Sequence, residues 1–163
     1  MGGLGSGRRL GFRKRTVEAC VALKIQTIVR AGLLEGFGGA GTITWRDPAG
    51  EPTFSCDCRV ERLSFSWVLL RLVYTVPATG EAVDLTVPLV TTCPPRSGSR
   101  WWFTCPLGTW VPGPSGGAWR GCERRVGRLY LPPGERAFGC RGCHDLTYRS
   151  TQTSGTWLAR LLG

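Results

Sequence analysis

The sequence has no long hydrophobic run, since its longest candidate, residues 67–70, ends at Arg71. A helix that crosses a bilayer needs about 20 consecutive apolar residues. The N-terminal residues are basic and Gly-rich, and no apolar stretch follows them, which is not the pattern of a secretory signal. We therefore expect a cytoplasmic protein that has no membrane partner.

Groups that carry acid–base or covalent catalysis are also scarce. The chain has a single histidine, His144, and no pair of acidic residues near its C-terminal cysteines. It has neither a phosphate-binding Gly-Lys-Ser/Thr loop nor a nucleophile motif between a strand and a helix. Because enzymes draw on such groups, the sequence predicts a protein that is not an enzyme.

What the sequence does contain is enough for a packed core. It has 163 residues, of which 42% are hydrophobic and 10% aromatic, and this fits one domain or one domain with a small additional module. Eight cysteines are present. In the reducing cytoplasm, cysteines serve as metal ligands and buried thiols more often than as disulfides.

The net charge of +10 is unevenly distributed along the chain. Residues 1–15 carry +5, residues 16–93 carry −2 and residues 94–163 carry +7. Two basic ends around a weakly acidic middle favour a polyanionic partner, usually nucleic acid. Nineteen of the 21 basic residues are Arg. A GC-rich genome would also favour Arg over Lys, but it would not place the excess at the two ends.

Residues 1–15 are expected to form a flexible basic arm, because they include five glycines and show no hydrophobic periodicity. A mobile basic segment can settle along a phosphate backbone. The candidate nucleic-acid contacts in this arm are Arg8, Arg9, Arg13, Lys14 and Arg15.

Residues 16–93 are predicted to form one helix on an antiparallel β-meander. Thr16 is a suitable N-cap for a helix over 17–31, whose apolar residues, Cys20 among them, recur at helical spacing. Strand-like alternation and turn residues mark strands at 42–46, 53–60, 67–76 and 82–90. Pro88 indicates that the last of these is an edge strand.

Two cysteines in this region, Cys56 and Cys58, have the spacing of half a metal site. In a strand, however, they share one face with Phe54 and Val60, because side chains alternate with a period of two. We therefore expect both cysteines in the hydrophobic core, where thiols behave as small apolar groups.

Residues 94–150 are predicted to form a zinc-ribbon-like module, followed by a C-terminal tail at 151–163. Residues 124–131 and 136–140 form a predicted hairpin joined by a Pro-Gly turn of type II. The hairpin ends at Cys140-Arg141-Gly142-Cys143, and a Cys-x2-Cys turn in this position is typical of half a zinc ribbon. Cys105 and Cys122 are the candidates for the other half.

The spacing of these cysteines is normal on one side and unusual on the other. Seventeen residues separate Cys122 from Cys140, whereas a Gly/Pro-rich insert of 16 residues, 106–121, separates Cys105 from Cys122. Loop length adds little to the free energy of closure, so we predict one structural Zn²⁺ held by Cys105, Cys122, Cys140 and Cys143. His144 could replace Cys122 as the fourth ligand, although adjacent residues seldom bind one tetrahedral ion.

Several segments together resemble a family of short, uncharacterised bacterial and phage proteins. They are GGLGSGR at 2–8, RWWF at 100–103, RRVGRLYL at 124–131 and CRGCHDLTY at 140–148. The resemblance implies a basic N-terminal tail, a small β-rich body and a C-terminal zinc ribbon. It also suggests an association with phage or mobile elements, but it brings no established activity.

The sequence therefore predicts an α+β fold: an N-terminal helix on a small antiparallel sheet, followed by the zinc-ribbon-like β module. The predicted function is non-catalytic nucleic-acid binding, with DNA favoured over RNA. Further candidate contacts in the module are Arg124, Arg125, Arg128, Arg141, His144 and Arg149. Of the four aromatic residues beside them, Trp101, Trp102, Tyr130 and Tyr148, we expect at least half in the module's core.

The alternative function is that of a protein adaptor. In this interpretation the ribbon and the loop that carries Trp110 and Trp119 bind a partner protein within a larger assembly, because buried Trp residues commonly anchor interfaces.

Overall fold

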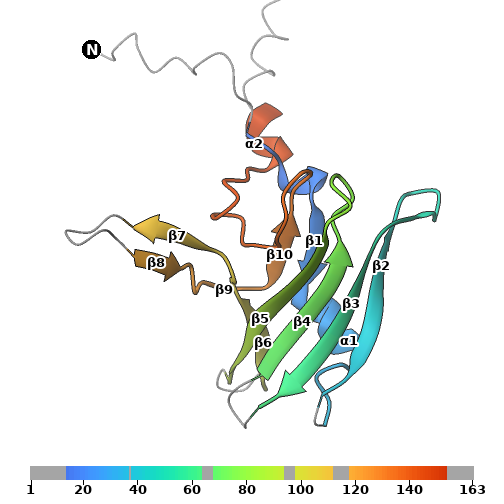
Figure 1. Cartoon of the computed structure of the whole chain (residues 1–163), viewed down its shortest axis with the longest axis vertical. Helices are drawn as coiled ribbons and strands as arrows, with labels where there is room; N and C mark the ends of the chain where they lie inside the picture. The colour runs from blue at the N-terminus through green and yellow to red at the C-terminus, as the bar shows by residue number, and fades with distance from the viewer. Residues whose placement is uncertain (1–13, 37, 64–67, 94–97, 112–117, 154–163) are drawn as a thin grey trace, which may run out of the picture.

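The computed structural model describes residues 14–36, 38–63, 68–93, 98–111 and 118–153. It is mostly β, and its main element is a six-stranded antiparallel sheet with the strand order β2-β3-β4-β5-β6-β9. These strands are β2 (Ala40–Arg46), β3 (Pro52–Arg62), β4 (Val68–Thr75), β5 (Ala82–Thr92), β6 (Arg100–Thr104) and β9 (Arg125–Val126). Figure 1 shows that the sheet is strongly curled.

Two smaller antiparallel sheets and three short helices complete the structure. One small sheet pairs β1 (Val21–Lys24) with β10 (Arg128–Leu131), and the other pairs β7 (Gly108–Val111) with β8 (Ala118–Gly121). The helices are the 3-10 turn η1 (Val17–Ala19), α1 (Ile25–Arg30) and α2 (Arg149–Thr153). None of the described helices is both long and apolar enough to cross a membrane.

The predicted β-meander is confirmed. The strands expected at 42–46, 53–60 and 82–90 correspond to β2, β3 and β5, and the strand expected at 67–76 corresponds to β4. Consecutive strands pair antiparallel, as in the register of Val60 with Leu70 and of Leu70 with Val87. The alternating hydrophobic pattern was therefore sufficient to locate these strands.

The position of β5 in the sheet corrects the prediction of an edge strand. β5 pairs with β4 on one side and with β6 on the other, so that β2 and β9 form the edges. β6 pairs only with residues 89–92 of β5. Pro88 lies directly beyond this paired segment, and its missing N–H therefore removes no hydrogen bond to β6.

The prediction of one continuous helix over 17–31 is also corrected. Residues of this segment form η1, β1 and α1 in turn, and the α-helix itself has only six residues. The hydrophobic pattern fits both periodicities, because Val21, Leu23 and Ile25 alternate as in a strand. β10 supplies the backbone partner that an isolated β1 would lack, and its pairing with residues 21–24 selects the strand.

The hydrophobic core lies between the concave face of the six-stranded sheet and the elements β1, α1 and β10. Leu23, Ile28, Leu70, Phe103 and Leu129 are all inaccessible to solvent, although they come from five different elements. Cys56 and Cys58 are buried in this core as predicted. Cys20 is only half-buried, and its thiol donates to the carbonyl oxygen of Thr16.

An aromatic cluster attaches the C-terminal segment to the sheet. Phe138 is fully buried and packs against the rings of Trp45, Phe54 and Tyr74, with centroid separations of 6.4, 6.2 and 5.3 Å. The Tyr74 hydroxyl also donates to the carbonyl oxygen of Arg136 at 2.9 Å. These contacts hold the segment after β10 against the concave face.

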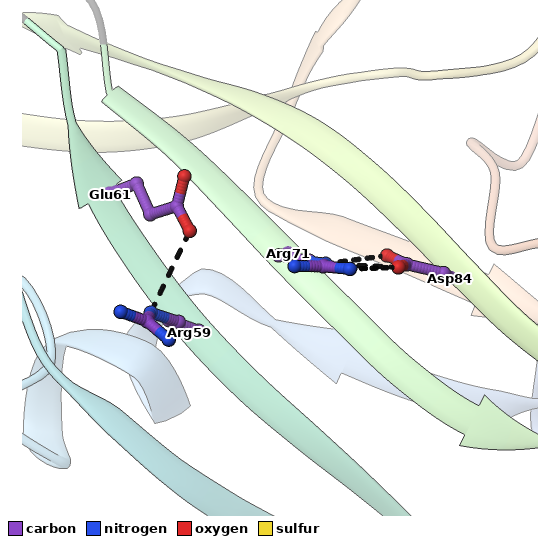
Figure 2. Close-up of polar contacts among 4 residues, drawn as sticks. All are labelled: Arg59, Glu61, Arg71 and Asp84. Carbon is purple, nitrogen blue, oxygen red and sulfur yellow. Dashed lines mark hydrogen bonds and ion pairs between the residues drawn. The ribbon is translucent and has the colours of Figure 1, made fainter.

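The opposite, solvent-exposed face of the sheet carries balanced charges. Arg59 on β3 lies in register with Arg71 on β4, and two like charges in this position would repel each other. Figure 2 shows that Arg59 pairs with Glu61 and that Arg71 forms a two-pronged pair with Asp84. Hydrogen bonds from Arg71 lower the pKa of the Asp84 carboxyl. This group of four residues therefore has no net charge.

Contacts in the structure join segments that the sequence analysis separates, at the predicted boundaries after residue 15 and after residue 93. β6 and β9 belong to residues 94–150, yet they extend the sheet that β2–β5 begin. Lys14 and Arg15, expected in the flexible arm, lie against the C-terminal segment, where Thr16 and Thr147 form a parallel bridge. Gln152 in α2 donates to the carbonyl oxygen of Lys14 at 2.7 Å.

We expect Phe138→Ala to lower the free energy of unfolding by about 3–5 kcal/mol, because it leaves a cavity among three aromatic rings. Chemical denaturation of the metal-loaded protein measures this loss. Val73→Thr on the exposed face of β4 is the control, and its effect should stay within about 0.5 kcal/mol. Equal effects of the two substitutions would contradict the role of the aromatic cluster.

Candidate metal centre and basic groove

Four cysteines from three separate segments lie close together. The Sγ atoms of Cys105, Cys122, Cys140 and Cys143 are all within 4.8 Å of one another. Cys105 follows β6, Cys122 follows β8, and the other two lie in the turn after Gly139. These four residues, which we call the cysteine cluster, could hold a metal ion, and they are the four that the sequence predicted.

The distances within the cysteine cluster suit tetrahedral coordination. The Sγ atoms of Cys105 and Cys143 are 3.9 Å apart, and those of Cys122 and Cys140 are 3.7 Å apart. A tetrahedral ion with metal–sulfur bonds of about 2.3 Å places its ligands about 3.8 Å apart. Four sulfur ligands would fill such a coordination sphere, so that no position remains for a substrate or a water molecule.

The long insert between Cys105 and Cys122 is accommodated by a hairpin. β7 and β8 pair from Gly108 opposite Gly121 to Val111 opposite Ala118. At the base of the hairpin, the N–H of Cys122 donates to the carbonyl oxygen of Leu107 at 2.7 Å. A hairpin returns the chain to its starting point whatever its length. The 16-residue gap therefore does not separate the two ligands in space.

The Cys140–Cys143 turn is positioned by the hairpin that the sequence predicts over residues 124–140. Glu135 N–H donates to the carbonyl oxygen of Pro132, and Gly134 between them has φ of +80°, as a type II turn requires. Tyr130 and Gly139 then exchange two backbone hydrogen bonds of 2.8 and 3.0 Å. The predicted turn is confirmed, and the returning strand is limited to this one bridge.

Backbone N–H groups point at the sulfur atoms. Cys140 N–H donates to Cys105 Sγ at 3.2 Å, and Cys143 N–H donates to Cys140 Sγ at 3.4 Å. Burial raises the pKa of the Cys140 thiol, but hydrogen bonds from Cys143 and from the neighbouring thiols take it below its ordinary value. This thiol is therefore the one that the surroundings prepare best for the thiolate form.

The thiols of Cys105 and Cys143 are harder to ionise when no cation is bound. Burial raises the pKa of Cys105 to about 11, and burial together with a hydrogen bond to Cys122 raises the pKa of Cys143 well above its ordinary value. Several negative charges within 5 Å repel one another strongly. The positive charge of a bound divalent cation would offset this repulsion. Coordination to the metal would also keep the thiols in their thiolate form.

Tight packing surrounds the turn that carries Cys140 and Cys143. A Cβ atom on Gly139 would lie 2.1 Å from Leu107 Cδ1 and 2.8 Å from His144 Nε2. A Cβ atom on Gly142 would lie 2.5 Å from Arg124 Nη1. At both positions, the absence of a side chain therefore allows neighbouring side chains to approach the backbone closely. Arg124, predicted as a nucleic-acid contact, is exposed but places its guanidinium against this turn.

His144 is not one of the four clustered ligands. Its Nε2 atom is buried, and among the described residues it has no hydrogen-bond partner. Burial also lowers the pKa of the imidazole. Nε2 faces Gly139 and is thus not placed to make the surface contact to phosphate that the sequence predicts for His144.

The described part of the basic arm has its charges paired. Lys14 Nζ lies 2.7 Å from a carboxylate oxygen of Asp145, and Arg15 Nη1 lies 2.9 Å from one of Glu135. Each cation is therefore already balanced by an acidic partner. Arg8, Arg9 and Arg13, the other predicted contacts of the arm, lie outside the described residues.

A groove of about 490 Å³ is lined by three of the remaining predicted arginines, Arg125, Arg128 and Arg141. We call it the basic groove. Its lining residues are Gln26, Arg100, Trp102, Arg125, Val126, Gly127, Arg128, Tyr130, Arg141 and Tyr148. They include four arginines and no acidic residue. Within the described ranges, no carboxylate lies at ion-pair distance from any of these four arginines.

The structure adds Arg100 and Gln26 to the arginines predicted at 125, 128 and 141, and it places Trp102, predicted beside them, in the same groove. Arg100 and Trp102 point to the same face of β6, because they are two residues apart in a strand, and the guanidinium of Arg100 lies 4.1 Å from the centre of the Trp102 ring. This i, i+2 spacing was visible in the sequence. Gln26 gave no sequence signal, since only the contact of α1 with the sheet brings it here.

The aromatic residues divide as expected between the core and the surface. Tyr130 is buried and Trp101 packs against the core, whereas Trp102 is half-buried and Tyr148 is 42% exposed. The guanidinium of Arg141 lies 5.0 Å from the centre of the Tyr148 ring. Arg149, the last predicted contact, is exposed, and its backbone N–H donates to Glu18.

Comparisons with known proteins return no match. No protein-family model matches the chain, and no curated protein or solved structure is significantly similar to it.

The cysteine cluster predicts a sharp difference between two cysteine variants. Co²⁺ is a spectroscopic probe for tetrahedral thiolate sites, and Cys122→Ser should weaken its binding. The loss should exceed the roughly 10–100-fold that follows removal of a group that only hydrogen-bonds to a metal ligand. Cys93→Ser removes an exposed thiol outside the cluster and should leave binding unchanged.

Titration of each variant, followed by the sulfur-to-cobalt absorption bands, measures these affinities. His144→Ala tests the alternative fourth ligand. Retained four-thiolate spectra in Cys122→Ser, or their loss in His144→Ala, would contradict the assignment of Cys122.

Proposed function

We propose that this protein is a non-catalytic nucleic-acid-binding protein whose cysteine cluster holds one structural Zn²⁺. The basic groove carries this proposal. It brings four arginines without acidic partners next to aromatic rings, and Arg guanidinium groups bind phosphate in a two-pronged geometry. The net charge of +10 supports attraction of a polyanion over longer distances.

Zinc is the metal that the ligand set fits best. Four cysteine ligands in a tetrahedral arrangement are typical of structural zinc sites, and the sulfur separations of 3.7 and 3.9 Å agree with zinc–thiolate bond lengths. A bound Zn²⁺ would join β6, the base of the β7–β8 hairpin and the Cys140–Cys143 turn.

The turn that carries two of the proposed zinc ligands also carries one residue of the basic groove. Arg141 lies between Cys140 and Cys143, and its side chain lines the groove. Fixing the turn with a metal therefore also fixes one of the four groove arginines. The proposed role of zinc is structural, because it positions groups that bind nucleic acid and takes no part in a reaction.

A protein adaptor is the second candidate function. The β7–β8 hairpin places Trp110 opposite Trp119 in its register, and Figure 1 shows the hairpin projecting from the six-stranded sheet. Tryptophans in a projecting element are frequent interface anchors. Such binding would persist at salt concentrations that abolish phosphate contacts.

Fluorescence anisotropy of the zinc-loaded protein with labelled DNA and RNA, titrated across salt, tests nucleic-acid binding. We expect an affinity that falls steeply as salt rises, since each neutralised phosphate contributes about 0.7–0.9 to the log–log slope. Replacing Arg125 and Arg128 by Gln should reduce that slope by about 1.4–1.8. The matched control replaces Arg30 and Arg46, two exposed arginines outside the groove.

No binding at low salt, or equal losses in the two double variants, would contradict binding at the basic groove. In the first case the search should turn to a protein partner.

Metal removal should weaken nucleic-acid binding by about tenfold or more, which corresponds to the loss of one hydrogen-bonded charged contact. The physical reason is that the turn carrying Arg141 loses its cross-link when thiolates lose their cation. Anisotropy after treatment with a strong chelator measures the effect, and Zn²⁺ added back should restore the affinity. Unchanged binding by the metal-free protein would show that binding at the groove does not depend on a metal in the cysteine cluster.

A further inference from the structure

We infer that the basic groove takes single-stranded nucleic acid, with an unpaired base stacked on Tyr148 and the flanking phosphates on the groove arginines. This inference rests on the proposed nucleic-acid function and names the form of nucleic acid that the groove selects. Arginines alone would serve single strands and duplexes equally. The aromatic residues of the groove distinguish the two.

The ring of Tyr148 is available to a ligand and is held in place. It is one of the few large hydrophobic side chains of the described chain that stay exposed, at 42%. The guanidinium of Arg141 lies over one face of the ring, 5.0 Å from its centre, so that a base would stack on the opposite face.

Trp102 supplies a second aromatic surface with a fixed orientation. Its Nε1 donates to Thr92 Oγ1 at 2.9 Å, and Arg100 lies over the ring. Thr92 lies on the neighbouring strand β5 and Arg100 on β6 itself, so both contacts come from the same sheet. The ring therefore does not need to be ordered when a ligand binds, and preorganised groups lose less entropy on binding.

The volume of the groove suits a nucleic-acid single strand whose unpaired bases point away from its sugar-phosphate backbone. Its volume of about 490 Å³ lies within the range of about 300–1,000 Å³ that is usual for sites of small organic ligands. A duplex keeps the faces of its bases stacked inside and presents only base edges and phosphates. Stacking on Tyr148 is therefore open to unpaired bases and closed to an intact duplex.

The described helices offer no alternative means of reading a duplex. α1 has six residues, which is too short for the recognition helix that the common DNA-binding motifs place in the major groove, and the described part of α2 has five. The exposed face of the sheet is neutralised by the pairs of Arg59 with Glu61 and Arg71 with Asp84 (Figure 2). Within the described residues, the basic groove is thus the better candidate surface.

The experiment compares three labelled ligands of one sequence, about twelve nucleotides long, a length within the usual site size of single-strand-binding folds. They are single-stranded DNA, single-stranded RNA and the DNA duplex. The full-length, zinc-loaded protein is used throughout, and anisotropy gives the affinities. We expect at least one single strand to bind about tenfold tighter than the duplex at the same salt concentration.

Tyr148→Leu removes the ring and keeps an apolar side chain, whereas Tyr148→Phe keeps the ring and is the matched control. Tyr148→Leu should weaken single-strand binding by about 5- to 150-fold, the range for the loss of one base–aromatic stack. Duplex affinity should change less than about twofold, because a stack that never forms cannot be lost. Tyr148→Phe should bind like the unchanged protein.

A second readout reports stacking directly and does not depend on affinity. A single strand that contains 2-aminopurine loses fluorescence when this base stacks on a ring. We expect quenching with the unchanged protein and with Tyr148→Phe, and clearly weaker quenching with Tyr148→Leu at saturating protein. Equal thermal melting of the variants excludes a loss of fold.

The outcomes separate this inference from the proposed function. Duplex binding as tight as single-strand binding, or the same loss for both ligands in Tyr148→Leu, would overturn the single-strand inference and leave nucleic-acid binding in place. Failure of all three ligands to bind at low salt would overturn both.

Discussion

The structure depends on the convergence of four thiols at one point. Cys105, Cys122, Cys140 and Cys143 follow three different strands or turns, yet their sulfur atoms lie within 4.8 Å of one another. Four such groups can ionise together only around a cation. The hairpin β7–β8 and the turn after β10 both begin or end at this cluster, so that a metal bound there would cross-link the C-terminal elements to β6.

Pairing of charges decides which basic residues are free to bind a ligand. Lys14 and Arg15 are balanced by Asp145 and Glu135, and the exposed face of the sheet is balanced in the same way. The four arginines of the basic groove have no carboxylate at ion-pair distance within the described residues. A count of charges along the chain cannot show this difference, because paired and unpaired arginines look alike in the sequence.

Sequence reasoning predicted the strands of the meander and the four clustered cysteines, since alternation and Cys spacing are local signals. It failed for residues 17–31, where Val21, Leu23 and Ile25 satisfy a strand pattern as well as a helical one. The pairing of β1 with β10 chose between the two patterns. It also failed for the position of β5 in the sheet. The neighbouring strand β6 belongs to residues 94–150, which were predicted to form a separate module.

The sequence by itself determined the identity of the four clustered cysteines, the burial of Cys56 and Cys58 and the turn at Gly134. Each of these depends on residue type and on spacing over a few positions. Only the tertiary structure decided that Arg100, Arg128 and Arg141 line one groove, that His144 turns its Nε2 inward and that Arg15 is paired. These outcomes depend on contacts between residues distant in the chain, and their free energies come from packing that no local pattern encodes.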